Sequence, residues 1–218
     1  MNIVTVLLTA VCALSFGFAG PSEAKQVTAS SPPSDIRKVI DYVDGLPSPN
    51  AEQLVMKAKA FYWLKDYSSA IVTISKSIAL KPDPESYLSR ALYTKHLKRY
   101  EEALKDCNKS EELGYRGSDL YALRGLIQLN LEDFAAALRD AERAVKTSDS
   151  SALGFYVKGA AESQLGLNEN AISSLDKSID LDPTDPVVYE LRGLVFKKLG
   201  RTNEANADLQ KAKSMGRQ

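Results

Sequence analysis

A fixed period of 34 residues runs through most of this chain and limits what the chain can fold into. A basic residue followed by a small one, an aromatic residue, a leucine and an alanine each recur with this spacing. Several sets of residues, each at its own fixed position within the same period, indicate stacked copies of a single structural unit. The recurring residues are Arg90-Ala91, Arg124-Gly125, Lys158-Gly159 and Arg192-Gly193; Tyr87, Tyr121, Phe155 and Tyr189; Leu97, Leu131, Leu165 and Leu199; and Ala103, Ala137, Ala171 and Ala205.

Five consecutive units fit this period and cover the chain from residue 51 onward. Each unit holds two apolar-periodic stretches of about 14 residues around a short polar turn, which is the pattern of two amphipathic helices. In the fourth unit the second stretch ends at Asp182-Pro183, a pair that stops a helix. We therefore expect five helical hairpins, at 51–83, 84–117, 118–151, 152–185 and 186–218.

These units resemble the tetratricopeptide repeat, a helix–turn–helix family of the same period. The resemblance covers residues 51–218 and rests on the aromatic residue, the Ala or Gly four residues later, the alanine of the second helix and the helix-ending proline. It implies an all-α fold, a right-handed α-solenoid of five hairpins whose first helices line a concave surface. The small residues allow close helix packing, and the leucines are expected to fill the layer beside them. The buried aromatic that the family places midway along the first helix is present as Phe61 and Phe196, and is replaced by Thr94, Gln128 and Glu162.

A second pattern joins the two helices within a hairpin. In three units an arginine of the first stretch is followed 16 residues later by an aspartate of the second: Arg90 and Asp106, Arg124 and Asp140, Arg192 and Asp208. The other two units lack both partners and carry Lys57 with Thr73, and Lys158 with Ser174. We interpret the arginines and aspartates as structural ion pairs across the hairpin; a binding role for the arginines is the alternative.

The N-terminal residues are typical of a targeting signal. Residues 3–19 are uncharged and apolar, and small residues follow, so we expect a signal peptide at 1–24, with a second possible cut before Gly20. An uncleaved N-terminal membrane anchor is the alternative, because no Lys or Arg precedes the apolar run. The prediction is an exported protein, periplasmic or secreted.

Both ends of the repeat array show signs of capping, which stacked hairpins need. Residues 25–33 are polar and Pro-containing and predict a flexible linker. Residues 34–50 predict a capping segment, with a helix over 34–45 that Ser34 begins and Gly45 ends. In the last unit Asn206 and Lys213 stand where the other second helices are mostly apolar, so the final helix is expected to cap the array itself.

Composition excludes several classes of function. The chain has 28 basic and 28 acidic residues, so it lacks the basic footprint that a nucleic-acid partner requires. His96 is the sole histidine and there are two cysteines, too few for most metal sites or for a His-based catalytic device. We expect Cys107 in the core and His96 on the solvated surface. The sequence predicts no enzyme, no cofactor and no metal.

The predicted concave surface offers a binding site for a protein or peptide. In the arrangement that the resemblance implies, apolar residues of the first helices point into this surface and charged residues lie at its ends. This composition suits a protein interface. The groove residues are Leu88, Leu92, Ala122, Leu126, Leu129, Tyr156, Ala160 and Leu194. The polar set with which related co-chaperones hold a C-terminal carboxylate is missing.

The function predicted is a non-catalytic adaptor or scaffold of the cell envelope or secretory compartment. It would bind a partner peptide or protein through the concave groove, and would meet a membrane only if the N-terminal segment stays uncleaved. The alternative is a membrane-anchored or self-associating assembly factor. A further alternative is that the groove is covered internally, by residues 25–45 or by a second copy.

Overall fold

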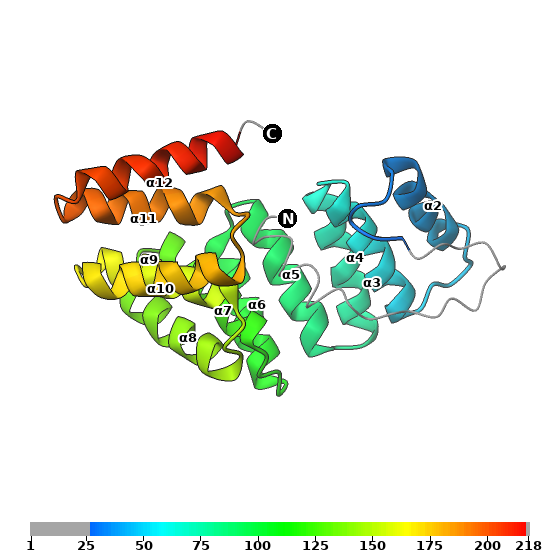
Figure 1. The fold of residues 1–218 in the computed structure, drawn as a ribbon. Helices are drawn as coiled ribbons and strands as arrows, with labels where there is room; N and C mark the ends of the chain where they lie inside the picture. The colour runs from blue at the N-terminus through cyan, green and yellow to red at the C-terminus, as the bar shows by residue number, and fades with distance from the viewer. Residues whose placement is uncertain (1–26, 217–218) are drawn as a thin grey trace. The chain divides into compact units, whose positions relative to one another are not determined.

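The computed structural model describes residues 27–216, which form eleven α-helices and no strand in that range (Figure 1). The predicted all-α helical-repeat fold is therefore confirmed. The predicted signal peptide lies outside the described residues. The helices are α2 (Pro33–Asp44), α3 (Ala51–Trp63), α4 (Tyr67–Leu80), α5 (Pro84–His96), α6 (Tyr100–Glu112), α7 (Ser118–Asn130), α8 (Phe134–Thr147), α9 (Ala152–Gln164), α10 (Asn168–Leu181), α11 (Pro186–Lys198) and α12 (Thr202–Met215).

The helices belong to two compact units that divide between Tyr115 and Arg116. In the N-terminal unit α2 packs on α3, and α3 to α6 pack on one another in chain order. In the C-terminal unit α7 to α12 do the same, and α9 also contacts both α7 and α11. Helix pairs that contact their sequence neighbours in this way are the signature of helical-repeat proteins.

The division falls between the second and third hairpins, within the stretch 51–218 that the sequence treats as one domain. Helix α6 has a distinctive residue here. Glu111 stands where the equivalent second helices α4, α8 and α10 carry Ile78, Val145 and Ile179.

The turn inside every hairpin has the same backbone conformation. Each first helix is followed by a leucine of the 34-residue register as its C-cap, at Leu64, Leu97, Leu131, Leu165 and Leu199. The next residue has positive φ, with Lys65 at 61°, Lys98 at 59°, Glu132 at 60°, Gly166 at 80° and Gly200 at 74°. Such a left-handed residue after the C-cap closes an α-helix. The leucines are thus C-cap residues, and the expectation that they fill the core is wrong for Leu97 and Leu165, which are 36% and 43% exposed.

Small residues bring the two helices of a hairpin together, as the sequence predicts. A Cβ placed on Gly159 of α9 would lie 2.7 Å from Leu175 Cγ and 3.1 Å from the Ala171 carbonyl oxygen, both on α10. The second-helix alanines Ala103, Ala137 and Ala171 have no exposed surface. The hairpin interior is therefore close-packed at this register, and additional volume there is costly.

The capping helix forms, although it does not begin where the sequence predicted. Helix α2 begins at Pro33 with Pro32 as its N-cap, and no side chain caps it. Ser34 therefore lies inside the first turn, because proline suits the first helical position and displaces the start by one residue. Ile36 and Val43 of α2 are buried, at 3% and 1% exposed, and α2 packs on α3.

Candidate functional site

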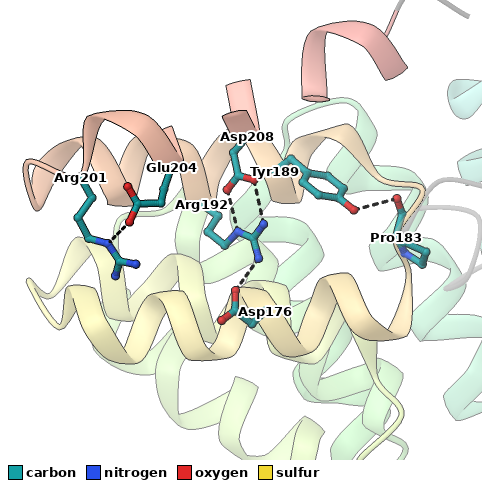
Figure 2. Close-up of polar contacts among 7 residues, drawn as sticks. All are labelled: Asp176, Pro183, Tyr189, Arg192, Arg201, Glu204 and Asp208. Carbon is teal, nitrogen blue, oxygen red and sulfur yellow. Dashed lines mark hydrogen bonds and ion pairs between the residues drawn. The ribbon is translucent and has the colours of Figure 1, made fainter. Parts of the chain in front are cut away.

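The predicted arginine–aspartate pairs form, and Arg192 shows their full geometry (Figure 2). Arg192 Nε donates to Asp208 Oδ2 at 2.7 Å, and Nη2 donates to Asp208 Oδ1 at 2.8 Å. Its Nη1 donates to Asp176 Oδ1 at 2.5 Å, on α10 of the preceding hairpin. The hydrogen bond to Asp208 is the main cause that raises the pKa of Arg192. One guanidinium therefore ties α11 to its partner helix and to the hairpin before it.

The other two pairs repeat this two-pronged geometry. The nitrogens Nε and Nη2 lie 2.8 and 2.7 Å from the carboxylate in the pair Arg90–Asp106, and 2.7 and 2.9 Å in the pair Arg124–Asp140. All three guanidinium carbons lie 5.4 to 5.7 Å from the ring centre of the tyrosine three residues earlier. The side chains of Arg124 and Asp140 are only 7% and 6% exposed. These arginines are occupied within the fold, which supports a structural role.

The two hairpins without arginine use a lysine with a different acid. Lys57 of α3 pairs with Asp44 of α2, which attaches the capping helix to the first hairpin. Lys158 of α9 lies 3.5 Å from Glu162 on the same helix. Glu162 is 3% exposed and accepts a hydrogen bond from Ser174 Oγ at 2.6 Å. In the sequence Glu162 stands where the family places a buried aromatic residue, and no ion pair was expected there. Its spacing of four residues from Lys158 is the signal that predicts the pair.

His96 lies in an aromatic cluster and not on the solvated surface, so that expectation is wrong. Its ring stacks on Tyr67 with centroids 4.5 Å apart, and Tyr62 Oη lies 3.1 Å from its Nε2. Tyr93 stacks in turn on Tyr62 at 4.8 Å. Burial, with the nearby charge of Lys95 as a smaller cause, lowers the pKa of His96 to about 4. The imidazole is therefore neutral at physiological pH and serves as a packed ring of the N-terminal unit.

The eight predicted groove residues are divided between the units and differ in exposure. Leu88 and Leu92 lie on α5 of the N-terminal unit and are 1% and 6% exposed. Ala122 on α7 and Ala160 on α9 are also buried. The expectation that these four side chains form an open apolar wall is wrong. For Ala122 and Ala160 the reason is packing between neighbouring first helices, since α7 contacts α9.

The remaining four residues lie on the three first helices of the C-terminal unit, and of these only Leu126 and Leu194 share a register of the repeat. Leu126 and Leu129 of α7 and Tyr156 of α9 are half-buried, and Leu194 of α11 is 46% exposed. We call these four residues the first-helix face. Burial and the acidic residues Asp185 and Glu190 raise the pKa of Tyr156, which keeps its phenol protonated.

Polar groups lie at the edge of the first-helix face. Lys198 Nζ at the end of α11 donates to Ser163 Oγ at 3.0 Å and to the Ser163 carbonyl oxygen at 3.2 Å, on α9. Lys197 and Glu190 of α11 are exposed. An apolar patch with a charged rim is the composition of a protein-binding surface.

The described part of the chain has neither a metal-ligand cluster nor a membrane-spanning helix. Residues 27–216 contain no group of three or more His, Cys, Asp or Glu side chains placed to hold a metal ion. Cys107, which the sequence places in the core, is buried there with no exposed surface. No helix within 27–216 has the length and apolar character to cross a bilayer.

Comparison with known proteins agrees with the fold. The tetratricopeptide repeat model matches residues 154–185, which are the fourth hairpin. Human tetratricopeptide repeat protein 13 is 29% identical over 122 residues, which are 56% of this chain and 14% of the relative. The chain thus spans a small part of that protein's length.

Solved structures show the same architecture over most of the chain. A thermophilic TPR protein of Thermus thermophilus superposes with a TM-score of 0.66 at 20% identity, covering 76% of this chain and 91% of the other. YrrB, a TPR protein with an unusual peptide-binding site, gives 0.60 at 18% identity, covering 86% and 93%. The fourth hairpin thus matches the tetratricopeptide repeat model, and the chain shares the helical-repeat fold of these solved TPR proteins.

Proposed function

We propose that this protein is a non-catalytic scaffold that binds a peptide or protein through the first-helix face of its C-terminal unit. The exposed leucine Leu194 of α11, which shares its register with the half-buried Leu126 of α7, carries the proposal. Repeat proteins of this class use their extended concave surfaces for binding, and the YrrB structure is described as having a peptide-binding site. The charged residues Lys197, Lys198 and Glu190 at the edge would orient the partner.

A peptide-library selection tests this proposal directly. Peptides selected on the intact protein are measured against Leu194→Asp, which places a charge on the face at an exposed position that tolerates it. We expect at least a tenfold loss of affinity with an unchanged melting temperature, because the apolar contact is replaced by a carboxylate that must be desolvated. Val72→Asp, at a 58% exposed position of α4 in the other unit, is the matched control and should bind like the unmodified protein. Equal losses in both variants, or none in Leu194→Asp, would contradict the proposal.

Self-association through the same face is the second candidate, because an exposed apolar patch also suits a second copy. Sedimentation velocity separates the two candidates. A concentration-dependent dimer that Leu194→Asp abolishes and Val72→Asp retains would favour an assembly unit over an adaptor.

We also propose export to the cell envelope or secretory compartment, on the support of the uncharged residues 3–19 and the small residues that follow. Mass spectrometry of the mature N-terminus tests this proposal. A chain that begins at Lys25 or Gly20 supports export, whereas one that retains Met1 favours the anchored alternative.

A further inference from the structure

The C-terminal unit has a polar recess on a different side of α9 from the first-helix face. It has a volume of about 350 Å³ and is lined by Phe155, Lys158 and Glu162 of α9 with Asn170, Ser173 and Ser174 of α10. Residues 155, 158 and 162 form one stripe of α9, and Tyr156, Ala160 and Ser163 form another. At about 100° per residue the two stripes lie roughly 120° apart around the helix axis.

Three other hairpins of this chain fill the equivalent position with their own guanidinium. Arg192 lies over Tyr189, with its central carbon 5.7 Å from the ring centre, and donates two hydrogen bonds to Asp208. Arg90 and Arg124 do the same in their hairpins. Within this fold the position is therefore a guanidinium site, built from an aromatic ring and a carboxylate.

The fourth hairpin keeps the ring and the carboxylate but not the guanidinium. Phe155 stands in the register of Tyr189, and Lys158 in the register of Arg192. The carboxylate comes from Glu162 instead of the second helix, where Ser174 has replaced the aspartate and donates to Glu162 Oε2 at 2.6 Å. Lysine is a shorter, single-point donor than arginine, and the recess opens where the arginine head group would lie.

Glu162 can accept a further donor. Lys158 Nζ lies 3.5 Å from Glu162 Oε1, longer than the 2.7–2.9 Å typical of a charge-assisted hydrogen bond. The lysine side chain is 28% exposed, while that of Glu162 is 4% exposed. The ammonium can therefore move into solvent, whereas the carboxylate stays fixed by Ser174 at the wall of the recess.

We propose that this recess binds the guanidinium of an arginine side chain presented by a partner protein. The planar group stacks on Phe155 and donates to Glu162 Oε1, as the chain's own arginines do in the neighbouring hairpins. Lys158 turns outward, so the carboxylate exchanges a loose cation for a better-matched one. This site is separate from the first-helix face, so either can fail without the other.

Titration with small probes, followed by amide chemical shifts of the full-length protein, tests the proposal. The probes are N-acetyl-arginine amide, the neutral isostere N-acetyl-citrulline amide, N-acetyl-lysine amide and free arginine. We expect shifts confined to the recess residues, and affinity for the arginine amide at least tenfold above that for the citrulline and lysine amides. Equal binding of citrulline, or shifts elsewhere, would overturn the proposal. Binding of free arginine at least tenfold tighter than its blocked amide would indicate that the ligand is a small metabolite. That result would overturn the proposal that a partner protein supplies the arginine.

Two variants remove the site in opposite ways. Glu162→Gln keeps the shape of the side chain but removes its charge, and Lys158→Arg fills the recess from within. Each substitution should lower the affinity for the arginine amide at least tenfold. Lys158→Arg supplies the residue that three hairpins already carry, so it remains informative even if Glu162→Gln fails to fold. Asp180→Asn, at an exposed position of α10 outside the recess, is the control and should leave affinity unchanged. Full affinity in Lys158→Arg would refute the proposal.

Discussion

Arg124 of α7 and Asp140 of α8 form the most buried of the three arginine–aspartate pairs. Their side chains are 7% and 6% exposed, and Nε and Nη2 of the arginine lie 2.7 and 2.9 Å from the two carboxylate oxygens. The pair joins the helices of one hairpin where solvent screening is weak. Because both side chains are buried, the loss of one partner should be costly.

Asp140→Asn is therefore expected to lower the unfolding free energy of the C-terminal unit by about 3 kcal/mol, because the Arg124 guanidinium stays buried after losing the charge of Asp140. Urea denaturation followed by circular dichroism measures the change. Glu169→Gln removes an exposed carboxylate that lies 3.8 Å from Arg201 and should leave the midpoint nearly unchanged. An equal loss of unfolding free energy in both variants would show that the buried pair stabilises the unit no more than the exposed pair does.

His96 predicts how the stability of the N-terminal unit depends on pH. Its pKa is about 4 in the folded chain, below the ordinary value of 6.5, so the unfolded state binds a proton first as pH falls. Stability conferred by the neutral imidazole is complete above pH 6.5 and is lost as pH falls toward 4. Because the side chain is only partly buried, we expect the unfolding free energy to fall by about 1 kcal/mol. This is less than the whole pKa difference between the folded and unfolded states would give.

The chain offers a clean way to measure this pH dependence. Trp63, the single tryptophan, lies at the end of α3, so its fluorescence reports unfolding of the N-terminal unit. His96→Phe retains an aromatic ring and should flatten the stability profile between pH 4 and 6.5, since no other histidine is present. An unchanged slope in this variant would assign the pH dependence to other groups.

The hairpin turns predict a stabilising substitution. Lys98 and Glu132 have positive φ of 59° and 60°, a conformation that costs a residue with a Cβ about 1 kcal/mol relative to glycine. Lys98→Gly and Glu132→Gly should each stabilise their unit by roughly that amount, and Gly166→Ala should destabilise by a similar amount. Thermal denaturation measures all three. Lys105→Gly inside α6 is the control and should destabilise, because glycine weakens a helix interior; a loss in all four variants would contradict the turn argument.

Close packing at Gly159 predicts a steric cost. The added methyl group of Gly159→Ala would lie 2.7 Å from Leu175 Cγ, and overpacking of this kind costs about 1–3 kcal/mol. Gly45→Ala is the comparison, since its nearest neighbour would lie at 3.5 Å, an ordinary contact. Leu175→Ala should partly relieve the clash in a double-mutant cycle measured by urea denaturation. Additive effects of the two substitutions would rule out direct contact as the cause.

The repeat period was sufficient to predict most of the architecture. Residues spaced by 34 identified five hairpins, and the 16-residue spacing from arginine to aspartate identified partners such as Arg192 and Asp208 before any geometry was known. The sequence predicts these features because they are local. Both helices of a hairpin lie within one 34-residue repeat, and the hairpin recurs five times.

Burial could not be read in the same way. Leu92 and Leu194 occupy the same register of the repeat, yet they are 6% and 46% exposed. His96 was expected in solvent and lies against Tyr67. Exposure depends on what packs against a residue from outside its own helix, and one register can face different neighbours in different hairpins.

The amino-acid sequence alone thus determined the helices, their pairing and the ion pairs within each hairpin, because these depend on contacts a few turns apart. Only the tertiary structure decided which apolar side chains remain accessible, that the array divides after Tyr115, and that Glu162 and Lys158 border an open recess. Those outcomes depend on how neighbouring helices fill space, and a position in the repeat does not specify the volume and charge of the side chains around it.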